Sequence, residues 1–350
     1  MSYSIPTFRH PNLPTNKLGY TSKDYEGAVS TLCAGCGHDS ISAAIIDACF
    51  KMSIPPHRVA KLSGIGCSSK TPTYFLSNSH GFNSVHGRMP SVATGANMAN
   101  RDLIYIGVSG DGDTASIGMG QFVHAVRRNV NMVYICENNG VYGLTKGQDS
   151  ATSDLGSVSK KGEPNALEPI DLCAIALQLG ASFVANSFSG DKQQLVPIIQ
   201  AAIAHEGFAF INVISPCVTF NNVPGSTKSY DYIRQHMAST NQVDYVPHAE
   251  EITTEYAPGT SESITMHDGS QIKLHKLDPK LDVHSRRSAL SLMKDYKAED
   301  KILTGILFID EDTQEIHEAM HTTATPLREL AEPQLCPGAT ALEAINQNYR

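Results

Sequence analysis

The sequence predicts an α/β fold in which a parallel sheet is flanked by helices, followed by a small C-terminal α+β appendage. Two observations predict the sheet: apolar runs alternate with helical patterns between about Ser22 and Asn221, and glycine-rich turns follow two of these runs. The composition agrees, because 41% hydrophobic and 18% charged residues over 350 positions are typical of a folded chain with a sizeable core.

The apolar runs are expected to be buried parallel strands, because they are short and most contain β-branched residues. They lie at Val59–Ile65, Leu103–Ser109, Met132–Cys136, Ser182–Ala185 and Phe208–Ile214. Apolar residues three and four positions apart predict helices around them, at Ile41–Met52, Ile117–Arg128, Pro169–Leu179 and Lys192–His205. Crossovers of this size suit a doubly wound sheet.

The rest of the chain is predicted to be accessory to this main domain, which takes residues 22–221. Residues 1–21 are expected to form an extended N-terminal arm. Residues 222–283 have little sustained periodicity and many Pro, Gly, Ser and Thr residues, which predicts an irregular linker or cover. In residues 284–350 a helix, strand, helix pattern resumes, at Arg286–Lys297, Ile302–Ile309 and Thr313–Met320. It is apolar enough to dock on the main domain but not to fold alone.

Charge and composition exclude several kinds of partner. The formal net charge is −8 and no basic cluster exists, so a nucleic-acid partner is not expected. No run of about 18 apolar residues occurs, and Met1–Tyr20 lacks the apolar stretch of a signal peptide, so we expect no membrane contact and a cytoplasmic location. Eight cysteines are too dilute for a disulfide scaffold and are expected to be core thiols or metal ligands.

The run Val108-Ser-Gly-Asp-Gly-Asp113 carries the first chemical signal, because it follows a predicted strand and opens a helix. Its glycines let the backbone approach a diphosphate at a helix N-terminus, where the dipole favours negative charge. Asn139 follows Asp111 by 28 positions, at the end of the next strand. Since open α/β sheets bind ligands at these strand ends, Asp111, Asn139 and the Val141 carbonyl are candidate ligands of Mg²⁺.

A second signal is a set of four cysteines, Cys33, Cys36, Cys67 and Cys217. Such a set binds either Zn²⁺ or an iron-sulfur cluster, and the spacing alone does not decide between them. Cys67 and Cys217 follow predicted strands, which places both beside the expected diphosphate site. His38 is expected to support or cap this site rather than to ligate. The other cysteines, at positions 49, 136, 173 and 336, are expected to be structural.

Taken together, these residues resemble the β-subunit of the 2-oxoacid:ferredoxin oxidoreductases, over about residues 25–225. The motifs that carry the resemblance are Cys33-Ala-Gly-Cys-Gly-His38, Gly64-Ile-Gly-Cys-Ser-Ser-Lys70, His86-Gly-Arg-Met-Pro-Ser-Val-Ala-Thr-Gly95, Gly110-Asp-Gly-Asp113, Ile117-Gly118 with His124-Ala-Val-Arg-Arg-Asn129, and Asn138-Asn-Gly-Val-Tyr-Gly-Leu-Thr-Lys-Gly-Gln148. One departure is Leu32-Cys-Ala-Gly-Cys36, where the family commonly has Trp-Cys-Pro-Gly-Cys. The thiol spacing is intact.

The resemblance implies cofactors and site residues. The four cysteines would hold one four-iron four-sulfur cluster, and Asp111, Asn139 and Val141 would hold Mg²⁺. Thiamine diphosphate would be lined by Ile65, Gly66, Cys67, Ser68, His86, Gly112, Asp113, Gly143 and Leu144. The implied reaction is the oxidative decarboxylation of a 2-oxoacid with coenzyme A to an acyl-CoA, CO₂ and reduced ferredoxin, which the same site could run in reverse.

The resemblance also implies a partner, because the glutamate that activates thiamine diphosphate in this family resides on an α-subunit. We therefore expect a heterodimer or heterotetramer, inactive as the β-subunit alone. The motif Cys67-Ser-Ser-Lys70, the motif His86-Gly-Arg88 and the C-terminal extension look most like the 2-oxoglutarate type. Lys70, His86 and Arg88 are the candidate catalytic residues, and Lys70 or Arg88 could pair with the distal carboxylate of 2-oxoglutarate. Either cation could instead face solvent or neutralise the diphosphate.

Three other interpretations stay open from the sequence. The substrate could be pyruvate or another 2-oxoacid. The protein could be a cluster-free thiamine-dependent decarboxylase or synthase, with zinc-binding or core cysteines. It could also be a non-enzymatic module with structural zinc and a nucleotide in the glycine-rich turn.

Overall fold

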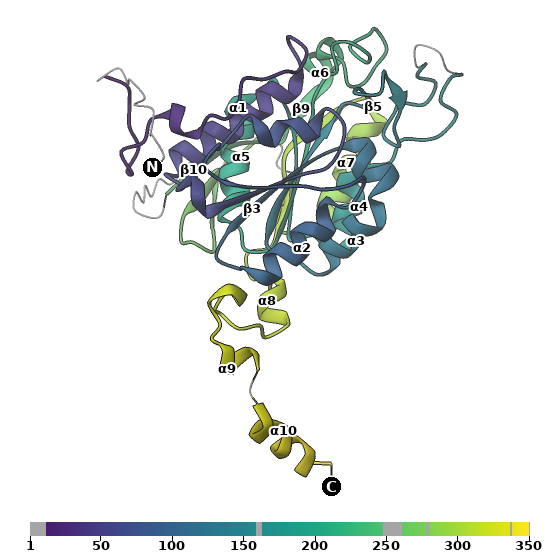
Figure 1. The fold of residues 1–350 in the computed structure, drawn as a ribbon. Helices are drawn as coiled ribbons and strands as arrows, with labels where there is room; N and C mark the ends of the chain where they lie inside the picture. Colours follow the sequence, from purple (N-terminus) through teal and green to yellow (C-terminus); the bar gives the residue numbers. More distant parts are fainter. Residues whose placement is uncertain (1–11, 159–162, 248–260, 278–279, 337, 350) are drawn as a thin grey trace.

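The computed structural model describes residues 12–158, 163–247, 261–277, 280–336 and 338–349 (Figure 1). Residues 1–11 of the predicted N-terminal arm lie outside this range. No helix among the described residues is long and apolar enough to cross a membrane.

An eight-stranded sheet forms the centre of the molecule, in the order β2-β1-β3-β4-β8-β7-β13-β9. The first six strands in this order run parallel, and β13 lies antiparallel to β7. Their bounds are β1 Val59–Ser63, β2 His80–Asn83, β3 Ile104–Gly110, β4 Met132–Asn138, β7 Phe183–Phe188, β8 Phe208–Ile214, β9 Met237–Ser239 and β13 Ile302–Ile309. The carboxyl ends of the parallel strands therefore meet at one edge of the sheet.

Two groups of helices cover the sheet (Figure 1). Helices α1 (Gly37–Lys51) and α5 (Lys192–Ala204) pack on each other over one face. A row of four helices covers the other face: α2 (Met89–Ala99), α3 (Met119–Arg127), α4 (Leu172–Leu179) and α7 (Arg286–Ala298). The predicted parallel sheet flanked by helices is confirmed.

The core between α3 and the sheet shows how apolar side chains hold a helix against the strands. Phe122 of α3 lies 5.4 Å from Tyr134 of β4 and 5.1 Å from Phe210 of β8, measured between ring centroids in edge-on contacts. All three side chains are buried. Each such aromatic group contributes on the order of 2 kcal/mol on burial, so this cluster anchors the helix that follows the glycine-rich turn.

Most predicted elements occur within a few residues of their predicted bounds. Strands β8 and β13 match residue for residue. The helix predicted from Ile117 begins at Met119, because Gly112–Ile117 forms a separate wider turn. Strand β2 and helix α2 were not predicted from the sequence; β2 is a short exposed edge strand without an apolar run.

The prediction of irregular structure in residues 222–283 is wrong for the residues that the structure describes. They form α6 (Tyr230–His236), β9 and a small antiparallel sheet of β10 (Asn241–Val246), β12 (Gln271–Lys276) and β11 (Ser261–Thr265). These strands are short and bury alternate residues, such as Val243, Ile264 and Ile272, against the main core. A search for sustained apolar runs does not detect such a pattern.

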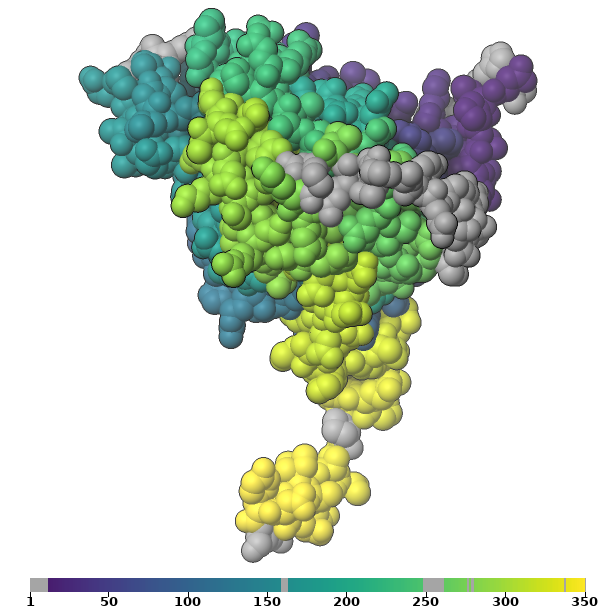
Figure 2. All heavy atoms as spheres, turned by 180° about the vertical axis from the view of Figure 1, so that it is seen from behind, coloured from purple at the N-terminus to yellow at the C-terminus, as the bar shows by residue number. Residues whose placement is uncertain are grey.

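The C-terminal segment is also more integrated than predicted. Strand β13 joins the main sheet beside β7, so this part completes the sheet instead of docking on it. The predicted helix Thr313–Met320 is the single turn α8 (Ile316–Ala319). Beyond it, α9 (Glu332–Leu335) and α10 (Gly338–Gln347) extend away from the body of the molecule (Figures 1 and 2).

Candidate cofactor site

A narrow cleft lies at the carboxyl ends of β1, β3 and β4, with a volume of about 20 Å³. Its lining includes all three predicted Mg²⁺ ligands and seven of the nine predicted cofactor-lining residues, namely Asp111, Asn139, Val141, Ile65, Gly66, Cys67, Ser68, Gly112, Asp113 and Gly143. The cleft therefore brings together residues that are more than 70 positions apart in the sequence. The other lining residues are His38, Gly110, Glu137 and Tyr142.

Asp111 is the carboxylate at the base of the cleft and is almost fully buried. Its Oδ2 accepts hydrogen bonds from the hydroxyls of Ser150 and Thr152, the latter at 2.7 Å, and its Oδ1 accepts from the Asn139 backbone nitrogen at 3.2 Å. Burial raises the pKa of Asp111, and these bonds oppose that rise. A buried carboxylate of this kind favours a bound cation.

The turn after β4 holds the other two candidate ligands together. The Val141 backbone nitrogen donates to Asn139 Oδ1 at 3.0 Å, and Asn221 Nδ2 donates to the Asn139 carbonyl at 2.7 Å. Gly140 between them has φ +72°, a conformation that glycine adopts without strain. The turn therefore presents amide and carbonyl oxygens beside Asp111, as a hard divalent cation requires.

Asp113 ties three loops around the cleft. Its Oδ1 accepts from the Gly87 backbone nitrogen at 2.7 Å, and its Oδ2 accepts from Ser109 Oγ at 2.8 Å and the Ile65 backbone nitrogen at 3.2 Å. A Cβ at Gly64 would lie only 2.0 Å from Asp113 Oδ2, which explains the glycine at that position. Asp113 thus positions the backbone of the cleft.

Tyr142 closes the cleft over the glycine-rich turn, and sequence reasoning missed it. Its hydroxyl donates to the Gly112 carbonyl at 2.9 Å, and a Cβ at Gly112 would meet its ring at 2.5 Å. The ring therefore packs directly on the Gly112 backbone. Its place within the run that follows Asn139 was the only sequence signal that could have found it.

His38 and Glu137 form a buried polar pair between the cleft and the cysteines. Thr71 Oγ1 donates to Glu137 Oε2 at 2.9 Å, while Glu137 Oε1 has no partner among the described residues. His38 Nδ1 lies 2.6 Å from Ser215 Oγ and 3.7 Å from Glu137 Oε2. Burial raises the pKa of Glu137 well above its usual value and lowers the pKa of His38 to about 4, so the imidazole is neutral near pH 7.

The four cysteines come from three loops that converge behind Gly143. A Cβ on Gly143 would lie 3.5 Å from Cys67 Sγ and 3.6 Å from Cys217 Sγ. The Gly37 backbone nitrogen donates to the Pro216 carbonyl at 3.3 Å, which brings the loop of Cys33 and Cys36 to Cys217. Burial, with smaller contributions from Glu137, Cys217 and Cys67, raises the pKa of Cys36 to about 12.

These sulfurs are not arranged as the ligands of one ion. Within the described ranges, no three His, Cys, Asp or Glu side chains lie close enough to share a single metal ion. A zinc ion would draw four thiolates to about 2.3 Å from one centre. The described thiols therefore do not form a closed zinc site.

The predicted substrate residues lie outside the lining of the cleft. Lys70, in the turn Ser68–Thr73, is half-buried, and its charge opposes the rise that burial causes in the pKa of Cys67. His86 and Arg88 are exposed, on the loop that Gly87 ties to Asp113. Leu144 is 52% exposed and also lies outside the lining.

Comparison with known proteins agrees with this geometry. Residues 64–213 match the family described as "Thiamine pyrophosphate enzyme, C-terminal TPP binding domain". This range begins directly after β1 and spans β2, β3, β4, β7 and most of β8, together with the residues that follow β1, β3 and β4 in the cleft. The fold and the cleft therefore define a thiamine pyrophosphate-binding domain.

Several relatives are more specific. The chain is 43% identical over 199 residues to the 2-oxoacid:ferredoxin oxidoreductase subunit beta of Saccharolobus solfataricus, covering 57% of this chain and 65% of that one. It is 35% identical over 246 residues to the 2-oxoglutarate oxidoreductase subunit KorB of Mycobacterium tuberculosis, covering 70% and 64%. It is 38% identical over 189 residues to the 2-oxoglutarate synthase subunit KorB of Methanocaldococcus jannaschii, covering 54% and 69%.

A solved structure extends the likeness to nearly the whole chain. The 2-oxoglutarate:ferredoxin oxidoreductase from Magnetococcus marinus, solved with 2-oxoglutarate, coenzyme A and succinyl-CoA bound, matches with a TM-score of 0.72 at 27% identity and covers 96% of this chain and 97% of that one. The sequence alignments span only about two thirds of each curated relative. The chain belongs to the β-subunits of the 2-oxoacid:ferredoxin oxidoreductases.

Proposed function

We propose that this chain is the catalytic β-subunit of an enzyme that oxidatively decarboxylates 2-oxoglutarate, with coenzyme A and ferredoxin as the other reactants. The observation that carries the proposal is that the candidate Mg²⁺ ligands and Cys67 line one cleft, with Cys217 beside Gly143 and the loop of Cys33 and Cys36 packed on the loop of Cys217. A thiamine enzyme that only decarboxylates does not need four thiols beside its cofactor.

The cleft suits thiamine diphosphate and Mg²⁺ in its donor set. Asp111 supplies a buried negative charge, and Asn139 and Val141 supply neutral oxygens on one turn. Gly110 and Gly112, which flank Asp111 and lack side chains, allow the backbone to approach a diphosphate closely. Bound thiamine diphosphate supplies the carbanion chemistry that releases CO₂ from a 2-oxoacid, and the protein positions and shields it.

The cysteines suit a four-iron four-sulfur cluster. Cys33, Cys36, Cys67 and Cys217 lie on three loops that pack together beside the cleft. Cys67 also lines the cleft. A cluster at these thiols would lie beside the cofactor, where a short distance favours electron transfer.

The 2-oxoglutarate assignment rests on named relatives and on Lys70. Two relatives and the matched structure carry 2-oxoglutarate in their names. Lys70 lies one turn from Cys67 with no ion-pair partner in the described part of the chain, so it is free to pair with a distal carboxylate. Pyruvate would leave that charge unpaired.

The site requires an α-subunit partner. Large apolar side chains stand exposed along the segment that leaves the cleft: Leu144, Leu155, Val158 and Leu167 are 52%, 56%, 64% and 76% exposed. Exposed apolar groups next to a cleft are typical of a protein interface. The assembled heteromer would work in the cytoplasm, where the thiols stay reduced.

The test is a metal analysis of the full chain purified without oxygen. We expect about four iron and four acid-labile sulfide per chain, and a reduced-cluster signal in the electron paramagnetic resonance spectrum after dithionite. Cys217→Ser should lose this signal, whereas Cys336→Ser, at an exposed cysteine remote from the cleft, should keep it. Zinc without iron would instead support a structural-zinc protein, and neither metal would support a cluster-free decarboxylase.

A further inference from the structure

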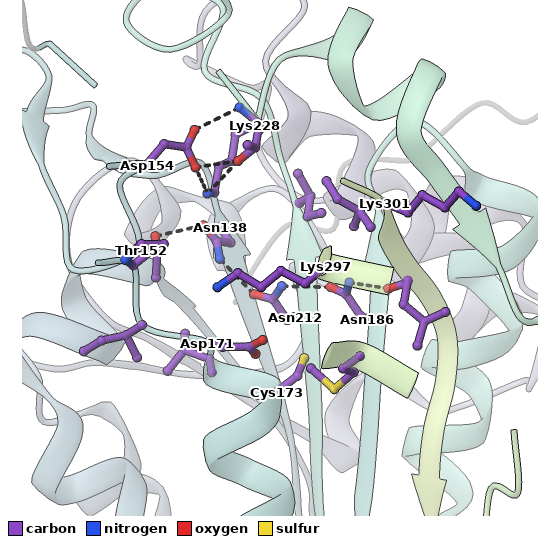
Figure 3. A pocket seen from close by; sticks show the side chains of 18 of the residues that line it. Asn138, Thr152, Asp154, Asp171, Cys173, Asn186, Asn212, Lys228, Lys297 and Lys301 are labelled. Carbon is purple, nitrogen blue, oxygen red and sulfur yellow. Dashed lines mark hydrogen bonds and ion pairs between the residues drawn. The ribbon is translucent and has the colours of Figure 1, made fainter. Parts of the chain in front are cut away.

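A second cavity of about 330 Å³ lies on the other side of β4 from the cofactor cleft (Figure 3). It is bounded by the carboxyl ends of β4, β8 and β7, by the start of α4 and β13 and by the end of α7. The volume lies within the range of small-molecule sites. We propose that it binds a small monocarboxylate, held by Lys297 and by a row of asparagine amides.

The floor of the cavity is a ladder of three asparagines from three neighbouring strands (Figure 3). Asn138 Nδ2 donates to Asn212 Oδ1 at 3.2 Å, Asn212 Nδ2 donates to Asn186 Oδ1 at 2.8 Å, and Asn186 Nδ2 donates to the Leu303 carbonyl at 2.6 Å. All amide groups thus point the same way. The ladder fixes the orientation of each amide in the cavity.

The ladder leaves donors unused. A side-chain amide carries two N–H donors, and each asparagine spends one of them in the ladder. The described residues offer no second acceptor to any of the three amides. Partly buried donors without partners favour a ligand that accepts hydrogen bonds.

The charges that line the cavity leave one free cation. Lys228 pairs with Asp154 at 2.8 Å, and Lys301 pairs with Glu299 at 2.7 Å. The Lys297 ammonium group has no ion pair or hydrogen bond within the described ranges, and Figure 3 shows its side chain extending across the cavity toward Asn138 and Asn212. The cavity therefore offers one ammonium group for one negative charge.

The acidic residues of the lining have partners of their own. Asp171 caps α4 by accepting from the Ala174 backbone nitrogen at 2.9 Å. Asp300 accepts from the Tyr232 hydroxyl and lies 3.7 Å from His236 Nε2. These carboxylates still disfavour a multiply charged anion such as phosphate, so the charge balance favours a monoanion.

The remaining walls are apolar, from Leu172, Ile214, Met293 and Ile302. A ligand with a short hydrocarbon body and one carboxylate satisfies both surfaces, since its oxygens accept from Lys297 and the amides while its carbons face the aliphatic walls. An inorganic anion would use only the polar side. This site is independent of the proposed cofactors and of the proposed reaction.

The test uses the full chain labelled with ¹⁵N-asparagine and titrated with acetate, propionate and butyrate at constant ionic strength. We expect the side-chain amide signals of Asn138, Asn186 and Asn212 to shift, with affinity rising up to about four-fold per added methylene. Butyramide and butylammonium, which have the same size but no negative charge, should bind at least about ten-fold more weakly than butyrate.

Two lysine variants on helix α7 test whether Lys297 binds the carboxylate. Lys297→Met should weaken butyrate binding at least about ten-fold, whereas Lys294→Met, one turn away on α7 and outside the cavity, should leave it unchanged. Equal binding of butyrate by both variants, equal binding of butyramide, or shifts confined to amides outside the ladder would each overturn the proposal. Binding of phosphate in preference to butyrate would overturn the choice of ligand class.

Discussion

The cofactor cleft and the amide-lined cavity lie on opposite sides of the same strand, β4, yet differ in nearly every respect. Glu137 and Asn139 face the cleft and Asn138 faces the cavity, because alternate residues of a strand point to opposite faces. The cleft is small and carries glycine motifs, whereas the cavity is over ten times larger and carries none. The larger of these two openings is therefore not the one that carries the sequence motifs.

The difference extends to the ionisable groups. The cleft buries Asp111, Glu137 and His38. Burial raises the pKa of the two carboxyl groups and lowers the pKa of the imidazole, so it disfavours the charged form of each. The cavity keeps its charged groups near solvent or in ion pairs. The cleft thus pays a desolvation cost that a bound cation can relieve, and the cavity does not.

Replacement of Asp111 should have the largest effect on the cofactor cleft, because it removes a buried charge. Asp111→Asn keeps an acceptor for Ser150 and Thr152 but removes the charge, so thiamine diphosphate affinity in the presence of Mg²⁺ should fall at least about 100-fold by isothermal titration calorimetry. The variant loses the hydrogen bond from the Asn139 backbone nitrogen but also a buried charge that burial disfavours, so the cofactor-free variant should unfold close to the wild-type temperature.

Asp102→Asn is the matched control, since Asp102 is exposed on the loop before β3. It should change neither the affinity nor the unfolding temperature. Cofactor affinity that survives in Asp111→Asn would remove Asp111 from the metal site, and a large drop in stability would mean that its charge is structural.

A smaller effect is expected in the pH dependence of the free energy of unfolding, which shows whether the cleft excludes water from His38. Burial lowers the pKa of His38 to about 4, against about 6.5 in an unfolded chain. Between these values the unfolded state binds one proton more than the folded state, so stability falls as pH falls from 6.5 to 4, by up to about 3 kcal/mol. Urea unfolding at pH 7, 6 and 5 measures this slope.

In His38→Asn the slope should decrease by up to one proton, while His124→Asn, at an exposed histidine of α3, should leave it unchanged. Other buried histidines, such as His205, whose pKa burial lowers to about 3, keep part of the slope in every variant. An unchanged slope in His38→Asn would show that water reaches the imidazole and that the cleft is open.

The contrast between cleft and cavity also explains what the sequence could predict. A site built from the backbone can be recognised in the sequence, because glycines such as Gly110, Gly112 and Gly140 are needed where a ligand or a turn excludes a side chain. The four cysteines can also be recognised in the sequence, because few other residue types bind a metal or a cluster through sulfur. The predicted Mg²⁺ ligands and most cofactor-lining residues therefore fall in one cleft.

A site built from common polar side chains gives no comparable pattern in the sequence. Asn138, Asn186 and Asn212 are ordinary residues on separate strands, and only the register of β7, β8 and β4 aligns them. Glu137 and Tyr142 were missed because their role depends on what they pack against, not on spacing. The small sheet of β10, β12 and β11 was missed because its pairing is antiparallel and its strands are short.

Removal of the Tyr142 hydroxyl should give the smallest effect, and it tests whether the cleft opens to admit its cofactor. The Tyr142 hydroxyl bond to the Gly112 carbonyl stabilises the closed cleft by about 1 kcal/mol. Tyr142→Phe should therefore bind thiamine diphosphate with Mg²⁺ up to about five-fold more tightly than the wild type by calorimetry, because less closing energy opposes entry.

Tyr245→Phe is the control, since its hydroxyl donates to Asp268 in the small sheet, away from the cleft. It should leave the affinity unchanged. Weaker binding in Tyr142→Phe would mean that the hydroxyl contacts the bound cofactor instead of closing an empty cleft. The cleft would then be preformed around its ligand, and its small volume would reflect a tight fit to the backbone, not a lid of one tyrosine.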